Sequence, residues 1–247
     1  MIPYFVQPRF SVLGTTFYAF GLLAALAFLL GGWMIVRRAD RFGLPRGTAE
    51  RLTLFTLLWG FCGSHVLYLL LFQSANLARR PWRLLNPLDG IYSFGGIVSG
   101  VLAMFWFARR YGLTRMQFWR YLDVVAFAFP FAWTLARTGC FLAHDHIGIA
   151  STSWLAVRFP EGPHLDLGLI EALFTASVAI CFLLLDRKPR PAPFFCGLWF
   201  LLYGPFRIWL DTLHQSSETP DLLFGCVSAA CGCVLLLVAR RNRARPY

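Results

Sequence analysis

Seven predominantly apolar runs, separated by short charged segments, dominate this sequence. A hydrocarbon core about 30 Å thick requires roughly 20 helical residues per crossing, and the runs are close to that length. Helices suit such runs because they satisfy every backbone polar group internally. We therefore predict an all-α integral membrane protein with about seven transmembrane helices. The predicted helices are Thr15–Val36, Leu52–Phe72, Ile91–Ala108, Phe118–Ala136, Leu165–Leu185, Phe194–Leu210 and Leu222–Val238.

The composition agrees with this class. Hydrophobic residues make up 57% of the 247 residues and charged residues only 14%, whereas soluble domains carry about 25% charged residues. The spans leave no room for a large soluble domain, and no internal repeat is visible, so we predict one polytopic domain over residues 1–247. Met1–Arg9 lacks the basic stretch of a cleavable signal peptide, and the first span is expected to stay in the protein.

The net charge of +11 could indicate a nucleic-acid partner. The basic residues, however, cluster at the ends of apolar spans, which is the pattern of cytoplasmic anchors near anionic lipid. We therefore predict contact with the bilayer and not with nucleic acid, an N-terminus outside and a C-terminus in the cytoplasm. The clusters are Arg37, Arg38, Arg41, Arg46 and Arg51; Arg109, Arg110, Arg115 and Arg120; Arg187, Lys188 and Arg190; and Arg240, Arg241, Arg243 and Arg245.

The longest loop on the predicted outer side is Thr138–His164. Within it, Trp154–Phe159 is rich in strand-forming residues and is followed by Pro160-Glu-Gly-Pro163. This pattern predicts a small hairpin, which would form an outer cap after the fourth helix.

Two arginines lie at the outer ends of predicted spans, Arg137 in the fourth and Arg207 in the sixth. Charged residues at this depth avoid lipid and face the interior of a helix bundle. The planar guanidinium group matches phosphate oxygens and keeps its charge when desolvated. We predict that the two arginines hold an anionic lipid headgroup and stabilise a phosphate released from it.

Four acidic residues are expected near these arginines, to orient them and to bind headgroup hydroxyls. They are Asp123, Asp145, Glu171 and Asp211. Asp211 follows Arg207 by four residues, which places both on one helix face. The alternative is a set of buried ion pairs that merely joins helices.

His144 and His146 flank Asp145, and either imidazole could take a proton from an incoming nucleophile. The His-Asp-His run could also suggest a metal, but no further ligands follow at a recognisable spacing, so neither a metal nor a cofactor is predicted. Six of the seven cysteines lie within apolar spans and are interpreted as small hydrophobic residues. Only Cys140, beside Arg137, stays open to another role.

Gly95 and Gly96 occur at the start of the third predicted helix. They allow either close helix packing or a helix N-terminus that faces a phosphate. Tyr18, in the first predicted span, could offer a hydroxyl to the same cavity.

Several segments resemble, in order, the motifs of the bacterial prolipoprotein diacylglyceryl transferases. They are Tyr18–Leu22, Arg37–Leu44, Gly63–Tyr68, Gly90–Gly96, Arg137–Gly148, Leu169–Leu173 and Tyr203–Asp211. The resemblance covers nearly the whole chain and agrees with a seven-helix layout. It implies transfer of a diacylglyceryl group from phosphatidylglycerol to the lipobox cysteine of a preprolipoprotein, at the outer face of the bacterial inner membrane.

Carried over by position, the resemblance implies that Arg137 and Arg207 bind the phosphate. It implies that the four acids hold these arginines or the headgroup, and that Gly139 and Gly148 allow a tight loop. The partners implied are phosphatidylglycerol, the signal peptide of a prolipoprotein and the lipid bilayer.

The chain departs from the family pattern at several positions. Phe94 stands where many members carry a histidine, His65 where an arginine is usual, and Asp211 where a glutamate is usual. These departures leave two alternatives: a divergent paralogue that transfers another lipid group, and a non-enzymatic lipid-binding membrane protein. A transporter is disfavoured because no related halves are evident.

Overall fold

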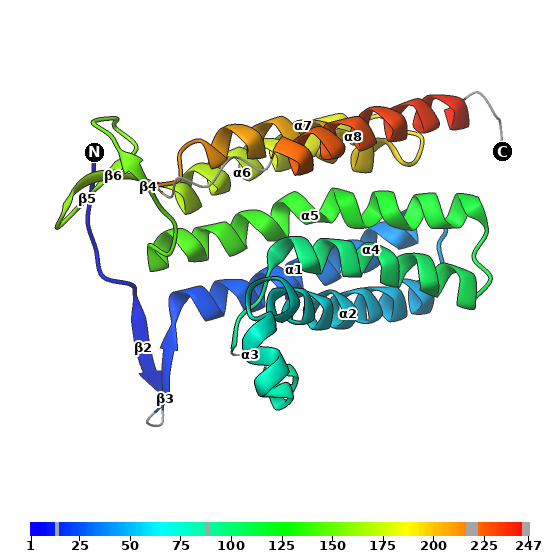
Figure 1. Cartoon of the computed structure of the whole chain (residues 1–247). Coiled ribbons are helices and arrows are strands. Elements are labelled where there is room, and N and C mark those ends of the chain that lie inside the picture. The colour runs from blue at the N-terminus through cyan, green and yellow to red at the C-terminus, as the bar shows by residue number, and fades with distance from the viewer. Residues whose placement is uncertain (13–14, 87–88, 216–221, 244–247) are drawn as a thin grey trace. The chain divides into compact units, whose positions relative to one another are not determined.

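A computed structural model describes residues 1–12, 15–86, 89–215 and 222–243 (Figure 1). Within these ranges the predicted all-α architecture is confirmed, with seven long helices near the seven predicted spans. They are α1 Ala19–Arg41, α2 Arg46–Phe72, α4 Ser93–Arg110, α5 Arg115–Ala143, α6 Leu167–Leu185, α7 Phe194–Asp211 and α8 Leu222–Arg243. A short helix α3, Ser74–Arg79, and a 3₁₀ turn η1, Pro81–Leu85, follow α2.

Five of the described helices are long and apolar enough to cross a membrane: α1, α2, α5, α6 and α8. The chain divides into two compact units. One comprises Met1–Met34 with Asp123–Tyr247, and the other comprises Ile35–Leu122.

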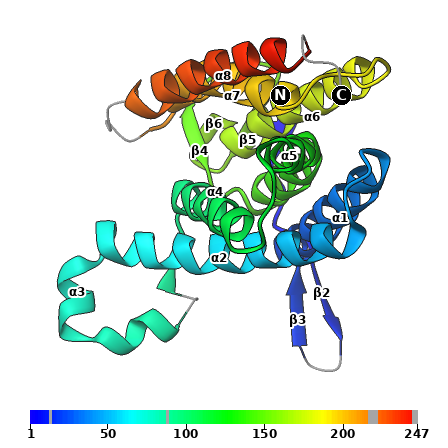
Figure 2. The same ribbon diagram turned by 90° about the vertical axis from the view of Figure 1, so that its right-hand side faces the viewer.

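In the unit Ile35–Leu122, α2 and α4 lie side by side (Figure 2). Glycines face each other across this contact. A Cβ atom on Gly96 would lie 3.4 Å from the carbonyl oxygen of Gly60, and one on Gly95 would lie 2.9 Å from Cβ of Leu67. Small residues thus let the two backbones approach closely, as in other membrane helix pairs.

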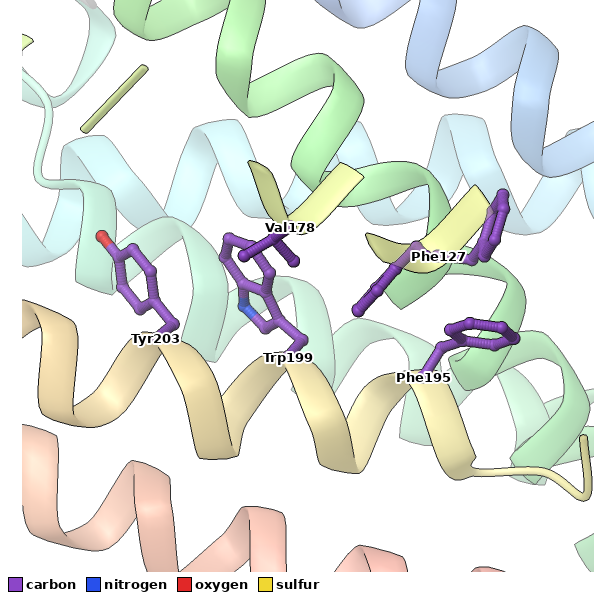
Figure 3. Close-up of a cluster of buried hydrophobic side chains, with 6 residues drawn as sticks. Phe127, Val178, Phe195, Trp199 and Tyr203 are labelled. Atoms are coloured by element: carbon purple, nitrogen blue, oxygen red, sulfur yellow. The ribbon is translucent and has the colours of Figure 1, made fainter. Parts of the chain in front are cut away.

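In the other unit, α7 and α8 also run side by side (Figure 1). Here a Cβ atom on Gly204 would lie 2.6 Å from the carbonyl oxygen of Gly225. An aromatic cluster joins α5, α6 and α7 (Figure 3). Its buried members are Phe127, Val178, Phe182, Phe195, Trp199 and Tyr203. Burying these large rings fixes α7 relative to α5 and α6.

The predicted hairpin after the fourth helix is confirmed. Strand β5, Ala156–Phe159, pairs antiparallel with β6, Gly162–Asp166. Two further strands complete a four-stranded sheet in the order β1-β5-β6-β4: β4, Ile147–Ala150, and β1, Ile2–Pro3. The parallel pairing of β1 with β5 joins residues far apart in sequence and was not predicted.

Two predicted boundaries are wrong. Tyr18 is not in the first span: it ends β3, Thr15–Tyr18, which pairs antiparallel with β2, Arg9–Val12. Its side chain is exposed. The local Thr-Thr-Phe-Tyr sequence favours a strand, and α1 begins one residue later.

The fourth span is longer than predicted, because α5 continues to Ala143 and not merely to Ala136. No proline interrupts this final stretch, and its apolar residues can still pack, so the helix continues. Arg137, Gly139 and Cys140 therefore lie on a helix and not in a loop.

Candidate active site

The centre of the site is an ion pair between α5 and α6. The Nε atom of Arg137 lies 2.9 Å from Oε2 of Glu171, and both side chains are buried, with exposed fractions of 11% and 3%. This Nε makes no hydrogen bond of good geometry, so the contact is one of opposite charges at short range. Two charges this deeply buried are tolerated because each neutralises the other.

The Glu171 carboxylate is held by two more side chains. The indole Nε1 of Trp133 donates to Oε1 at 2.7 Å, and the hydroxyl of Tyr203 donates to the same oxygen at 2.8 Å. Trp133 also lies under the guanidinium group, whose carbon is 4.8 Å from the ring centroid. Hydrogen bonds and a cation–π contact thus fix both partners. Tyr203 ends the aromatic cluster of Figure 3, with its hydroxyl directed away from the other rings.

Gly168 explains how α6 comes so close to α5. A Cβ atom there would lie 2.7 Å from the backbone nitrogen of Phe141. Glu171 is nearly one turn after Gly168, and Arg137 is one turn before Phe141. The close approach of the two backbones therefore places Glu171 against Arg137.

Arg207 and Asp211 form a second ion pair on α7, with Nη2 and Oδ1 2.8 Å apart. The four-residue spacing predicted this pair. Tyr203 lies one turn before Arg207, and its hydroxyl donates to Glu171, the partner of Arg137. Tyr203 therefore links the helix of Arg207 to the buried pair of Arg137 and Glu171.

A third group of side chains follows the end of α5. The ligand atoms of Cys140, Asp145 and His146 all lie within 4.8 Å of one another. Nη1 of Arg137 approaches the Cys140 sulfur at 3.7 Å, as a weak donor. Burial lowers the pKa of His146 below its ordinary 6.5; nearby Asp145 opposes this effect and Arg137 adds to it. Burial thus favours the neutral imidazole.

His144 has a different environment. Its ring is almost fully buried; Nδ1 lies 2.8 Å from Oδ2 of Asp166, and Nε2 lies 3.2 Å from the carbonyl oxygen of Phe5. Tyr4 and Phe159 pack on the ring. Both nitrogens are engaged in joining the N-terminal segment to the cap, so this geometry favours His146 over His144 as a proton acceptor.

Asp166 also begins α6, where its side chain accepts a hydrogen bond from the backbone nitrogen of Leu169. Burial raises the pKa of Asp166, and the contacts with His144 and with backbone nitrogens lower it in part. The residue is thus a helix cap joined to the buried histidine.

Gly139 and Gly148, which were expected to allow a tight loop, both lie against other backbones, and Gly139 does so on helix α5. A Cβ atom on Gly148 would lie 2.8 Å from the carbonyl oxygen of Leu213, and one on Gly139 would lie 3.4 Å from backbone atoms of Phe20. Gly148 also bridges to His214, which joins β4 to the turn after α7. These contacts explain why side chains are excluded there.

The structure separates Asp123 from Arg137. Its Oδ1 accepts a hydrogen bond from the backbone nitrogen of Cys196, 3.0 Å away, in the first turn of α7. Fourteen residues of one helix, or about 21 Å, lie between Asp123 and Arg137. This carboxylate caps the opposite end of α7 from Arg207, and a role of Asp123 in binding the headgroup stays a prediction.

Gly95 and Gly96 belong to the unit Ile35–Leu122, where they contact α2. This contact supports close helix packing, and a role in phosphate binding stays a prediction. The side chain of Phe94 lies outside the described residues.

Sequence reasoning missed three residues of the centre: Trp133, Tyr203 and Gly168. An apolar helix gives no sign of which aromatic side chain will meet a buried acid. The polar ends of Trp133 and Tyr203 were an available signal, because a buried indole or phenol needs a hydrogen-bond partner.

Comparisons with known proteins identify the family of this chain. The description of the matching family is "Prolipoprotein diacylglyceryl transferase", and the match covers residues 8–240. A phosphatidylglycerol–prolipoprotein diacylglyceryl transferase of Sodalis glossinidius is 29% identical over 92% of this chain and 87% of its own length. The protein of that name from Yersinia pestis is 28% identical over the same shares. The chain belongs to the prolipoprotein diacylglyceryl transferase family.

Proposed function

We propose that this protein transfers a diacylglyceryl group from phosphatidylglycerol to the lipobox cysteine thiol of a preprolipoprotein. A bond forms between the acceptor sulfur and a glyceryl carbon, and the bond from that carbon to the phosphate oxygen breaks. The electron pair leaves with the phosphate as glycerol phosphate, and the thiol gives up its proton. Family membership and the names of the relatives support this assignment.

The observation that carries the proposal is the buried, oriented guanidinium group of Arg137. Glu171 holds its Nε side, and Nη1 faces Cys140. Among the described residues Nη2 makes no hydrogen bond, so it can donate to a phosphate oxygen. A donor fixed in this way stabilises charge that develops on the leaving phosphate without having to reorganise.

Arg207 is the second cation of the proposed phosphate site. Its partner Asp211 fixes one edge of the guanidinium. Tyr203, one turn earlier on α7, donates to Glu171 of the Arg137 pair, which supports convergence of the two arginines. Two cations on one leaving phosphate suit a product with increased negative charge.

In this proposal the acceptor thiol lies beside Asp145 and His146. These side chains are 40% and 41% exposed, unlike the buried ion pair, so a peptide from outside the protein can reach them. The thiol would then lie next to Arg137 on the side of Cys140.

The protein is a multi-pass protein of the bacterial inner membrane, as the family and the apolar helices indicate. We propose that the cap strands face the outside and the C-terminal arginines the cytoplasm. The distribution of basic clusters supports this orientation.

Complementation tests the function directly. A strain depleted of its own diacylglyceryl transferase would express the intact chain or the variant Arg137→Ala or Arg207→Ala, and the mass of a reporter lipoprotein would be measured. The intact chain should restore the diacylglyceryl mass increment, and each variant should lower it at least about 100-fold. Arg158→Ala removes an exposed arginine of β5 and should leave the increment unchanged.

Membrane content and thermal unfolding of each variant are measured alongside. Loss of the increment in a variant that is inserted and folded supports catalysis, whereas loss of folded protein alone supports a scaffold role. Full activity of both variants would refute the phosphate assignment.

A further inference from the structure

Cys140, Asp145 and His146 form a cluster that the phosphate site does not use. It combines a thiol, a carboxylate and an imidazole, whose ligand atoms all lie within 4.8 Å of one another. Cys140 is buried, whereas Asp145 is exposed and His146 half-buried. The cluster thus has a closed side, at the sulfur, and an open side from which a ligand can enter.

The fold holds the three residues in this arrangement through the backbone. Helix α5 ends at Ala143, and His144 has a φ of 52°, which turns the chain sharply. The backbone nitrogen of Asp145 then donates to the carbonyl oxygen of Cys140 at 3.4 Å. The carbonyl oxygen of His146 accepts from the backbone nitrogen of Leu167 at 2.9 Å. The turn is further fixed by the buried contact of His144 with Asp166.

Sulfur, nitrogen and carboxylate oxygen together are a donor set typical of zinc, which binds them in a tetrahedron at about 2.0–2.3 Å. Two ligands of such a tetrahedron lie roughly 3.4–3.6 Å apart. Oδ1 of Asp145 and Nε2 of His146 are already 3.8 Å apart. Side-chain movements of about 1 Å would close the triangle on a metal, with one position left over.

The charges also balance. Before the acceptor binds, a thiolate, a carboxylate and Zn²⁺ sum to zero, and Arg137 is neutralised by Glu171 at 2.9 Å. The acceptor thiolate then adds one negative charge. A zinc ion would therefore not face an uncompensated guanidinium. Nη1 of Arg137 lies 3.7 Å from the sulfur of Cys140. A bound metal would itself displace the thiol proton, because the thiolate is the form that binds metal.

We propose that Cys140, Asp145 and His146 bind one Zn²⁺ ion and that the acceptor thiol takes the fourth position. The coordination of the acceptor thiol rests on the proposed function. On coordination the acceptor thiol becomes a thiolate and its proton leaves to solvent, so that His146 acts as a ligand and not as a base. A sulfur lone pair then bonds to the glyceryl carbon while the carbon–oxygen bond breaks toward the phosphate. The resulting thioether is neutral, a weaker ligand than the thiolate, and leaves the metal.

Metal binding is tested on the purified full chain in detergent. Zinc is added, and the excess that is not bound is removed by gel filtration. Elemental analysis should find about one zinc per chain, and cobalt in its place should give a thiolate-to-cobalt charge-transfer band. Both signals should be lost in Cys140→Ser and weakened at least about tenfold in His146→Gln. Cys62→Ser, which changes an exposed cysteine of α2, is the matched control and should retain both.

Absence of stoichiometric zinc and of the cobalt band in the folded intact chain would overturn the inference. The two proposals fail separately when transfer is assayed on the same samples with phosphatidylglycerol and a lipobox peptide. If a chain that binds no zinc still carries out transfer, the zinc proposal is refuted and the proposed function stands. If the chain binds zinc but carries out no transfer, the zinc site stands and the proposed function is refuted. Equal transfer by the zinc-loaded intact chain and Cys140→Ser would refute the role of the fourth position.

Discussion

Replacing Glu171 by glutamine tests whether the buried ion pair organises the site. Glutamine keeps the shape and one acceptor oxygen for Trp133 and Tyr203, but it removes the charge that faces Arg137 at 2.9 Å. Removing one partner of a buried pair costs about 3–5 kcal/mol, because the other charge stays desolvated. For a chain of this size that corresponds to a fall in Tm of roughly 6–20 °C.

Activity should fall as well, since the guanidinium loses the contact that positions it. A misplacement of about 1 Å near reacting groups lowers turnover by about 100-fold. The assay is diacylglyceryl transfer to a lipobox peptide in proteoliposomes, with Tm measured on the same preparation. The matched control is Glu161→Gln, the same chemical change in the exposed turn between β5 and β6.

The control should leave both Tm and turnover unchanged. If Glu171→Gln lowers Tm no more than Glu161→Gln does, the ion pair does not hold α5 and α6 together. If Tm falls while turnover per folded molecule is unchanged, Arg137 does not need Glu171 to reach its substrate. Either result would contradict the reasoning from this contact.

Three more predictions follow from other parts of the fold. Gly168→Ala should destabilise the protein by about 1–3 kcal/mol and reduce transfer, because its Cβ would meet a backbone nitrogen at 2.7 Å; Gly47→Ala, with no atom within 4 Å, should change neither Tm nor transfer. His144→Ala should lower stability by about 2–3 kcal/mol and expose the N-terminal segment to protease, since Asp166 loses its buried partner; a smaller effect than that of His164→Ala would contradict this role. A green fluorescent protein fused after the C-terminus should fluoresce, and alkaline phosphatase at the same point should be inactive; the reverse pattern would refute the proposed orientation.

Much of the fold could be predicted because its signals are local. Each apolar run favours a helix in a bilayer, and this predicted the seven long helices without knowledge of their neighbours. The β5–β6 hairpin was predictable for the same reason, since strand formers and turn residues stand side by side in the chain. Arg137, Glu171 and Arg207 were found because charge is costly at those depths.

Other features were not predictable because they depend on contacts between distant residues. The sequence around Asp123 does not indicate that its carboxylate will cap α7, where it accepts from the backbone nitrogen of Cys196, 73 residues further along the chain. Tyr18 stands beside an apolar run, yet pairing with Arg9 makes it part of a strand. From the sequence, His144 and His146 are equivalent candidates for the proton acceptor. Only the burial of His144 between Asp166 and Phe5 distinguishes the two.

The residues alone therefore determined that the chain lies in a membrane and where its helices run. They also determined which charged residues lie at a depth where charge is costly. Tertiary structure decided which charges meet. Hydrophobic burial is non-directional and depends on composition, so it can be read along the chain. Hydrogen bonds and ion pairs act over a few ångströms, so the pairing of Arg137 with Glu171 depended on how closely α6 packs on α5 at Gly168.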